Sequence, residues 1–470
     1  MNVPPTKPES GAATVLGSLA GLVHSVRYDE LPAGVIKAAK ALILDTLGCA
    51  YGGLHSDLGI AVRRVAIDCG GSPQSTLIGT GEKTSAALAT FVNGSLLRYL
   101  DSNDYYFARD PAHPSGNLAV ALAVGERERC SGKDLLAALV AAYEVHMRLC
   151  NFAGEPSLWK RGWHHGTNAQ FSTAALAARL SWDDPLRTAH AMAIAGTHQN
   201  TLAQLQSGAV SMIKATVEAW VAKAGVEAAL LAGVGVTGPL PLMEGTNGWA
   251  ASVAGCVDFK ALTAPVSGGR YYLLETSVKP YPAVATALAP IRAAIELHRA
   301  AVPRPADIEK IVVHLPGFAL ATPSAHPGRR YPGSIESAQH SFYYCTVIAL
   351  LDGECGEAQF SPSKLADATV RELLAKTELT EDSALNDLWP QAAGGAVDIH
   401  MHDGTVRRHR CPYPPGHPRF PLDAGELADK FYGYAAPVLS RRRAQALHDA
   451  VDSMEDCADL RDLTELLAAP

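Results

Sequence analysis

Hydrophobic positions recur mostly at helical spacing along this chain. Within residues 32–50, for example, Val35, Ala39, Leu42, Ile43 and Leu47 fall three or four positions apart. The same period predicts further helices over residues 14–26, 85–100, 118–126, 132–149, 167–180, 185–195 and 212–232. Because β-branched alternation is nearly absent here, we expect this half to be all-helical, with Ala-rich faces that favour close helix packing.

The pattern changes near residues 267–270. Residues 308–315 alternate and are rich in Ile and Val, which predicts a strand, and residues 396–401 and 405–411 flank an Asp-Gly pair typical of a hairpin. Helices are predicted over 282–300, 335–351, 364–374 and the tail from 424. The predicted fold is therefore mainly α. A large all-helical domain (1–268) is completed by C-terminal helices (412–470), and a smaller α+β domain (269–411) forms a lid over it.

Composition narrows the function classes. A chain of 470 residues is long enough for two domains, and its 48% hydrophobic and 19% charged residues are typical of a soluble protein. The net charge of -7 gives no basic excess, so a nucleic-acid partner is not expected. No apolar run spans a membrane without Gly, Pro or charge, and no signal-peptide pattern opens the chain. Nine cysteines lack any CxxC spacing, which favours reduced thiols in the cytoplasm and argues against an iron–sulfur cluster.

One short stretch concentrates acid/base groups. The predicted helix over 85–100 ends with Asp101 and Asp104, three residues apart and hence on one face. Carboxylates are unfavourable at a helix C-terminus, where the macrodipole prefers cations. A polar turn then brings His113 to the start of the next helix. Such a cluster is often only a set of helix caps, but it also has the groups for acid/base chemistry on an anion.

The strings RYLDSNDYY and PAHPSGN resemble the signature of the MmgE/PrpD family, which includes 2-methylcitrate dehydratase, cis-aconitate decarboxylase and iminodisuccinate epimerase. The resemblance covers nearly the whole chain. It implies a cofactor-independent enzyme acting on a small di- or tricarboxylate, and it implies a homodimer. The Ala-rich helices offer flat surfaces for such a dimer.

Further site residues follow from the residues and from that resemblance. His164, beside His165, precedes an Ala-rich helix, where the dipole favours a neutral imidazole, and it fits the Gly-aromatic-His pattern of relatives. Lys214 opposes the dipole of the helix it opens, which suggests that a substrate carboxylate offsets its charge. The resemblance also implies roles for Lys279, in a Lys-Pro-Tyr-Pro motif, and for Tyr344 on the lid helix, although one aromatic on an apolar helix is more often a core residue.

The chain departs from the family pattern at two positions. Many relatives place a lid histidine shortly after the Lys-Pro-Tyr-Pro motif, whereas this chain has Val284, with Ala285 and Thr286 following. Relatives commonly have Thr after the second aspartate, whereas this chain has Tyr105, a bulky phenol expected to reshape the pocket. The identity of the substrate is therefore not carried over from the family.

These residue types suggest one reaction class. Removing a proton next to a carboxylate creates an enolate-like dianion that needs nearby cations or hydrogen-bond donors. We expect His113 or His164 to take the proton, with Asp101 orienting the imidazole or protonating a leaving hydroxyl if its pKa is raised. Asp104, Lys214, His165 and Lys279 are expected to bind substrate. The chain lacks a Walker loop, GxGxxG and HExxH, so no cofactor and no metal is expected.

Which reaction the enolate-like intermediate undergoes stays open. Loss of hydroxide gives dehydration, which the motifs favour, while epimerisation and decarboxylation are alternatives within the family. Outside these lyase and isomerase reactions, the alternatives are a non-catalytic carboxylate-binding protein, which the changes at Val284 and Tyr105 favour, and a helical scaffold. Retention of Asp101, His113, His164 and Lys214 argues against the binding protein, and the scaffold is the weaker of the two alternatives.

Overall fold

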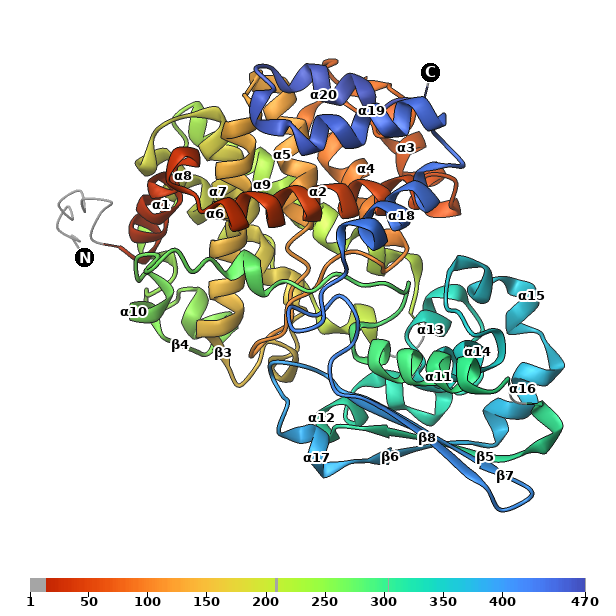
Figure 1. Ribbon diagram of the computed structural model, residues 1–470. Coiled ribbons are helices and arrows are strands. Elements are labelled where there is room, and N and C mark those ends of the chain that lie inside the picture. The colour runs from red at the N-terminus through yellow and green to blue at the C-terminus, as the bar shows by residue number, and fades with distance from the viewer. Residues whose placement is uncertain (1–13, 208–209, 303, 470) are drawn as a thin grey trace.

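The computed structural model describes residues 14–207, 210–302 and 304–469. Helices dominate, and strands gather into one small sheet apart from two short pairs (Figure 1). The predicted fold class, mainly α with a smaller α+β part, is confirmed.

The larger part is a stack of helices with an apolar core. Its helices are α1 (Val15–Ser25), α2 (Ala33–Gly53), α3 (Asp57–Cys69), α4 (Ala86–Tyr99), α5 (Gly116–Glu128), α6 (Gly132–Phe152), α7 (Ala169–Ser181), α8 (Pro185–Gly196) and α9 (Val217–Gly233). One of them, α6, is long and apolar enough to span a membrane, but 89% of it is buried inside the protein, so it is a core helix.

Small residues set how closely these helices approach. A Cβ atom added at Gly94 of α4 would lie 3.0 Å from the Cβ of Ala219 on α9. Because the two backbones nearly touch there, Arg98, one turn beyond Gly94, reaches Glu218 next to Ala219. The packing of two Ala-rich helices thus creates a buried ion pair that neither sequence segment shows alone.

Two predictions for the helical part need correction. The helix predicted over 212–232 begins with a 3₁₀ segment, η6 (Met212–Thr216), before α9, and α3 was not predicted. Lys214 therefore lies in the tighter turn that precedes the α-helix.

The smaller part places helices on one face of a four-stranded sheet (Figure 1). Its strands are β5 (Ile308–Leu315), β6 (Thr377–Glu381), β7 (Gly395–Met401) and β8 (Val406–Cys411), in the order β6-β5-β7-β8. The hairpin β7–β8 pairs antiparallel, with Val397 opposite His409, whereas β5 and β6 run parallel. The helices are α11 (Leu288–Ala300), α13 (Ile335–Gln339), α14 (Phe342–Asp352) and α16 (Ala368–Ala375).

Several of these elements differ from the prediction. The helix predicted over 364–374 is broken at Ala366 and Asp367, between α15 (Pro362–Leu365) and α16, and Asp367 caps α16. The helix predicted over 335–351 is broken at His340 and Ser341, where Ser341 caps α14 by accepting the backbone N–H of Tyr344. Strand β6 was not predicted, because its alternation is short and largely polar.

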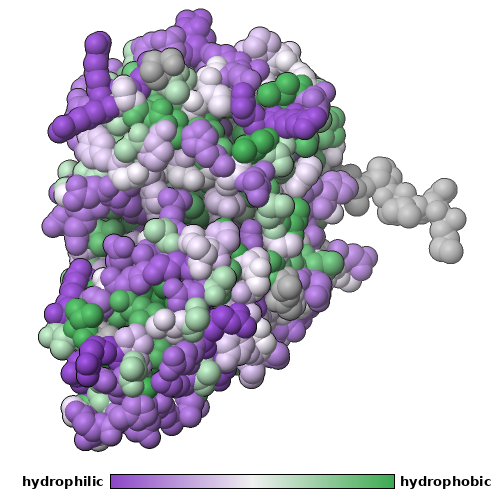
Figure 2. Space-filling view, turned by 90° about the vertical axis from the view of Figure 1, so that its right-hand side faces the viewer, coloured by the Kyte–Doolittle hydropathy of each residue, from purple (hydrophilic) through white to green (hydrophobic). Residues whose placement is uncertain are grey.

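After the sheet, the chain returns to the helical part. Helices α18 (Ala424–Ala435), α19 (Arg441–Asp452) and α20 (Leu460–Leu466) pack against it, with α18 lying across α2 (Figure 1). A Cβ atom on Gly48 of α2 would lie only 3.1 Å from Cα of Phe431, so this contact is also close. On the face shown in Figure 2, hydrophilic residues cover most of the surface and apolar ones form small separate groups.

Candidate active site

Asp101 is the centre of a buried charged cluster. Helix α4 ends at Tyr99, so Asp101 lies in the following turn, with a left-handed φ of 53°, and not on the helix face that the sequence predicted. Its Oδ1 atom lies 2.9 Å from Nζ of Lys214 and 2.9 Å from Nζ of Lys279. Lys279 also donates to the Asp101 backbone carbonyl. A strained backbone held by buried ion pairs is typical of a functional position.

The surrounding cations decide the charge state of Asp101. Burial by itself would raise its pKa, but Lys214, Lys279 and Arg98 together hold the pKa well below the usual range. Asp101 therefore stays ionised, and the expectation that it donates a proton is not supported. Burial also lowers the pKa of Lys214, and it lowers the pKa of Lys279 to about 8.

Glu218 forms the second anionic centre of the cluster. Its Oε2 atom accepts a hydrogen bond from Nε of Arg98 at 2.9 Å, and its Oε1 atom lies 3.3 Å from Nε2 of His165. Arg98 also lies 3.6 Å from the carboxylate of Asp101. Arg98 and the two lysines thus face two ionised carboxylates directly, and Asp104 is a third acidic group that acts on Arg98. The cationic side chains are buried, so a bound carboxylate would accept charge-assisted hydrogen bonds from them.

His113 is held as a neutral imidazole with one free lone pair. Burial, followed by the nearby Arg98 and Lys279, keeps its pKa well below the usual range. Its Nδ1 atom lies 2.6 Å from the backbone carbonyl oxygen of Asp104. Because a carbonyl can only accept, Nδ1 carries the proton and Nε2 offers a lone pair. This arrangement is that of a general base.

His164 has the opposite tautomer. Its Nδ1 atom accepts a hydrogen bond from the backbone N–H of Gly166 at 3.0 Å, and its own backbone N–H donates to Thr201. Burial keeps the pKa of His164 well below its usual range, so the ring is neutral and Nε2 carries the single proton. Among the described residues Nε2 has no partner. His164 is therefore placed to donate a hydrogen bond.

Asp104 is occupied by the protein itself. Its carboxylate accepts the backbone N–H of Ser115 at 3.1 Å, the Ser115 hydroxyl and the Tyr143 hydroxyl at 2.9 Å. Burial raises its pKa to about 6. The predicted role in binding substrate is thus replaced by a positioning role, because Asp104 fixes both the start of α5 and, through its carbonyl, the ring of His113.

The lid contributes a histidine that sequence reasoning missed. Nε2 of His340 lies 3.6 Å from Oδ2 of Asp101, and its Nδ1 atom lies 3.0 Å from the carbonyl oxygen of Glu336. Burial lowers the pKa of His340 to about 3, so the ring is neutral. The lid thus brings an imidazole to the cluster from another position than the one where a histidine was expected from the family resemblance, which is Val284 here. The signal was the Gln-His-Ser motif at residues 339–341, close to which Tyr344 was the predicted site residue.

Tyr344 lies in the lid core and not in the cluster. Its hydroxyl donates to the carbonyl oxygen of Gln359 at 2.6 Å, and its ring packs near Phe360. The predicted catalytic role is therefore corrected to a structural one, since helix α14 turns this side chain toward its own domain. A single aromatic residue on an apolar helix is more often a core residue, and Tyr344 is such a residue.

Tyr105 also points away from the cluster. Its ring packs with Phe107, Ala285 and Leu288 in a small apolar group between the two parts. Its backbone pairs with Ser277 through hydrogen bonds of 2.8 and 2.9 Å. The expected reshaping of the pocket by this phenol is thus not found.

His164, His165 and Glu218 are the one group among the described residues with donor atoms close enough to hold a metal ion, all within 4.8 Å of one another. The fit is poor for two reasons. The proton on Nε2 of His164 occupies the lone pair that a metal would need, and Glu218 is already shared with Arg98. The nearby Arg98 and Lys214, which both act on His164, further disfavour a divalent cation.

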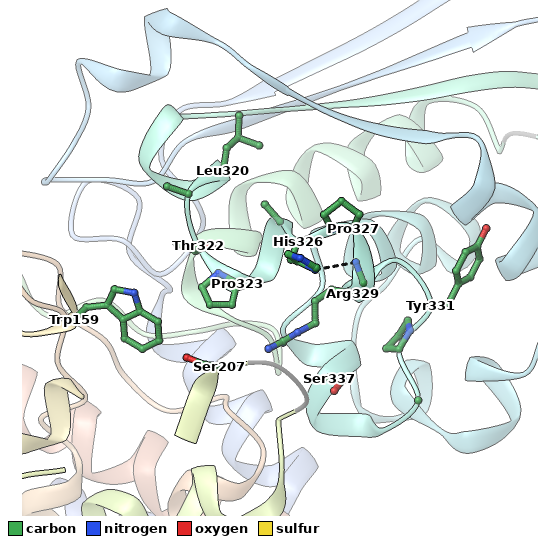
Figure 3. A pocket seen from close by; sticks show the side chains of 15 residues that line it. Trp159, Ser207, Leu320, Thr322, Pro323, His326, Pro327, Arg329, Tyr331 and Ser337 are labelled. Carbon is green, nitrogen blue, oxygen red and sulfur yellow. Dashed lines mark hydrogen bonds between the residues drawn. The ribbon is translucent and has the colours of Figure 1, made fainter. Parts of the chain in front are cut away.

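A cavity of about 780 Å³ opens where the two parts meet (Figure 3). Trp159 and Ser207 line it from the helical part, and Arg329 and Ser337 are among the lid residues that face it. Among the described residues, none of those that line it is acidic. Arg329, which lines the cleft, donates to the backbone carbonyl of His340 at 3.4 Å. The side chains of the Asp101 cluster do not line the cleft and are themselves almost fully buried.

Comparison with known proteins places the whole chain in one family. Residues 17–262 match the model of the MmgE/PrpD N-terminal domain, and residues 281–456 match that of the MmgE/PrpD C-terminal domain.

Its relatives include two kinds of lyase. The chain is 29% identical to mouse cis-aconitate decarboxylase, with 97% of this chain and 94% of the relative covered. It is 28% identical to the human cis-aconitate decarboxylase, over 97% and 95% of the two chains. It is 26% identical to 2-methylcitrate dehydratase of Cupriavidus necator, over 85% and 86%. The chain therefore belongs to the MmgE/PrpD family and is an enzyme with acid/base chemistry of the lyase type.

Proposed function

We propose that this enzyme removes a proton next to a carboxylate of a small di- or tricarboxylate and dehydrates a hydroxy acid of the 2-methylcitrate kind. One observation carries the proposal: the Nε2 lone pair of neutral His113 adjoins the buried cationic side chains of Arg98, Lys214 and Lys279. A base and an anion site are what this reaction needs.

The steps use residues of this chain. Nε2 of His113 takes the proton, and the electrons of the C–H bond form an enolate-like dianion. Lys214 and the Nε2–H of His164 stabilise the added negative charge. The C–O bond then breaks, and the leaving hydroxide takes a proton from Lys279, whose pKa of about 8 suits an acid at neutral pH. Water and an unsaturated acid result, and His113 and Lys279 exchange protons with solvent to restart the cycle.

Decarboxylation of an unsaturated tricarboxylate is the second candidate. The relatives named cis-aconitate decarboxylase are slightly more similar in sequence than those named 2-methylcitrate dehydratase. That reaction starts by releasing carbon dioxide and ends by protonating a carbanion, so it needs an acid but no initial base. The lone pair on His113 favours dehydration on this ground.

The test offers 2-methylcitrate, citrate and cis-aconitate separately to the purified protein. Product formation is followed by proton NMR and by carbon dioxide release. We expect a new double bond from a hydroxy acid without carbon dioxide, and its loss in His113→Ala. Carbon dioxide release from cis-aconitate alone would replace dehydration by decarboxylation. Binding by calorimetry without turnover, and without deuterium exchange next to the carboxylate, would indicate a binding protein.

Two further expectations belong to the proposal. The chemistry is cofactor-independent, because cationic side chains supply the charge stabilisation that a metal would otherwise give. The protein works in the cytoplasm as a homodimer. A suitable apolar face includes Met212, Ile213 and Trp220, each 48% exposed. Light scattering should give twice the chain mass, and Trp220→Glu should lower it; a monomeric wild-type protein would contradict the homodimer.

A further inference from the structure

Lys430 of the C-terminal helix α18 contacts the backbone beside the candidate site. Its Nζ atom donates to Oδ1 of Asp45 at 2.6 Å, to the backbone carbonyl of Ser102 at 2.6 Å and to the backbone carbonyl of Lys279 at 2.8 Å. Ser102 directly follows Asp101. The ammonium group of Lys430 therefore contacts the backbone beside Asp101 and the backbone of Lys279, the two partners of one central ion pair. All three of its donors are used.

We propose that Lys430 is a positioning residue, which holds the turn carrying Asp101 and the segment carrying Lys279 at the separation where their side chains meet. The consequence for turnover rests on the proposed function. Without the shared ammonium, each backbone carbonyl would lose a buried hydrogen bond, and the two segments would lose the group that joins them. The two segments are far apart in the sequence, because Asp101 and Lys279 are 178 positions apart.

The surroundings of Lys430 support this role. Its side chain is 9% exposed, and that of Asp45 is fully buried. Burial would lower the pKa of Lys430, but Asp45 raises it overall, so the ammonium stays charged. Tyr434, one turn further along α18, donates to the Ser102 hydroxyl at 3.1 Å. Two successive turns of α18 thus hold the residue after Asp101.

The position of α18 gives the contact a second consequence. Lys279 lies where the chain leaves the helical part for the lid, and α18 follows the segment by which it returns. The Lys430 ammonium therefore lies at the junction of the two parts, close to both crossings. Holding Lys279 there aligns a lysine of the crossing segment with a carboxylate of the helical part.

The chain offers a matched control. Lys40 of α2 is also largely buried, with a side chain 13% exposed, and it also binds C-terminal residues, donating to the carbonyl of Asp452 at 2.6 Å and pairing with Glu455. It makes no contact with the Asp101 turn or with Lys279 among the described interactions. Lys430→Met and Lys40→Met each remove one buried ammonium from a comparable position.

Two measurements test the proposal in full-length protein. Hydrogen–deuterium exchange followed by mass spectrometry needs no substrate: Lys430→Met should speed exchange in peptides covering residues 101–106 and 276–281, and Lys40→Met should not. Kinetics on the accepted acid should show kcat/KM falling about 100-fold in Lys430→Met, mainly in kcat, because a small displacement of reacting groups costs that much. Lys430→Arg should recover part of the loss, since it keeps the charge and donors.

The outcomes separate the possibilities. Unchanged exchange in both peptides, or equal loss of kcat in Lys430→Met and Lys40→Met at matched stability, would overturn the positioning role. If Lys430→Met does not fold, Lys430→Gln, which keeps a donor, is measured in the same way. If the wild-type protein turns over none of the acids, the proposed function fails, whereas the exchange experiment still decides whether Lys430 holds the two segments.

Discussion

Replacing Asp101 by Asn tests the charge balance on which the candidate site depends. Asparagine has nearly the same shape as aspartate and tolerates the left-handed φ of 53°, so the change removes charge with little backbone strain. It leaves Lys214 and Lys279 without the carboxylate that lies 2.9 Å from each ammonium. Removing one partner of a buried ion pair costs about 3–5 kcal/mol, so the free energy of unfolding should fall by that amount.

The assay is urea unfolding of the protein without substrate, with the slope compared to detect loss of cooperativity. Glu378→Gln is the control, because Glu378 pairs with Lys310 at 2.6 Å on the lid surface with side chains 57% and 40% exposed. Such exposed pairs contribute about 0–1 kcal/mol. Adding Lys214→Met to Asp101→Asn should recover about 1–3 kcal/mol, since it removes one unpaired cation. A loss from Asp101→Asn no larger than that of the control, with no recovery in the double variant, would refute this account of the cluster.

Three further predictions follow from the geometry. His113→Gln should lower kcat at least about 100-fold, because it removes the base. His164→Gln keeps a hydrogen-bond donor and should lower kcat about tenfold or less. The reverse order in steady-state kinetics would exchange the roles of the two histidines. The pH profile of kcat/KM should fall above about 8, where Lys279 loses its proton, and below about 6, where protonation of Asp104 weakens the hydrogen bonds that it accepts from Ser115. An alkaline limb unmoved by Lys279→Arg would contradict the first assignment. Dialysis against a chelator should leave the rate unchanged, and a loss restored by a divalent cation would contradict a metal-free site.

The sequence was most informative where a local pattern has one physical solution. Strand β5 and the hairpin β7–β8 were predicted closely, because alternation and an Asp-Gly turn specify them locally. Asp101, Lys214 and Lys279 were predicted as site residues, and the structure brings all three together. The position of Lys214 against the dipole of its predicted helix led to the prediction of a carboxylate partner.

The roles within the site depended on tertiary contacts. Whether a histidine donates or accepts is set by the partner of its other nitrogen, and for His113 and His164 that partner is a backbone group fixed only in the fold. Tyr344 and His340 lie one turn apart, yet only His340 faces Asp101, because the direction of a side chain depends on how its helix packs.

By itself, the sequence determined the helical architecture, the small sheet and the set of charged residues, since periodicity and motifs are local properties of the chain. Only the tertiary structure decided which charges meet and which protons are held. Pairing energies and pKa values depend on distance and burial. Distance and burial are set by segments far apart in the sequence, because Lys430 of α18, for example, contacts Ser102, 328 positions away.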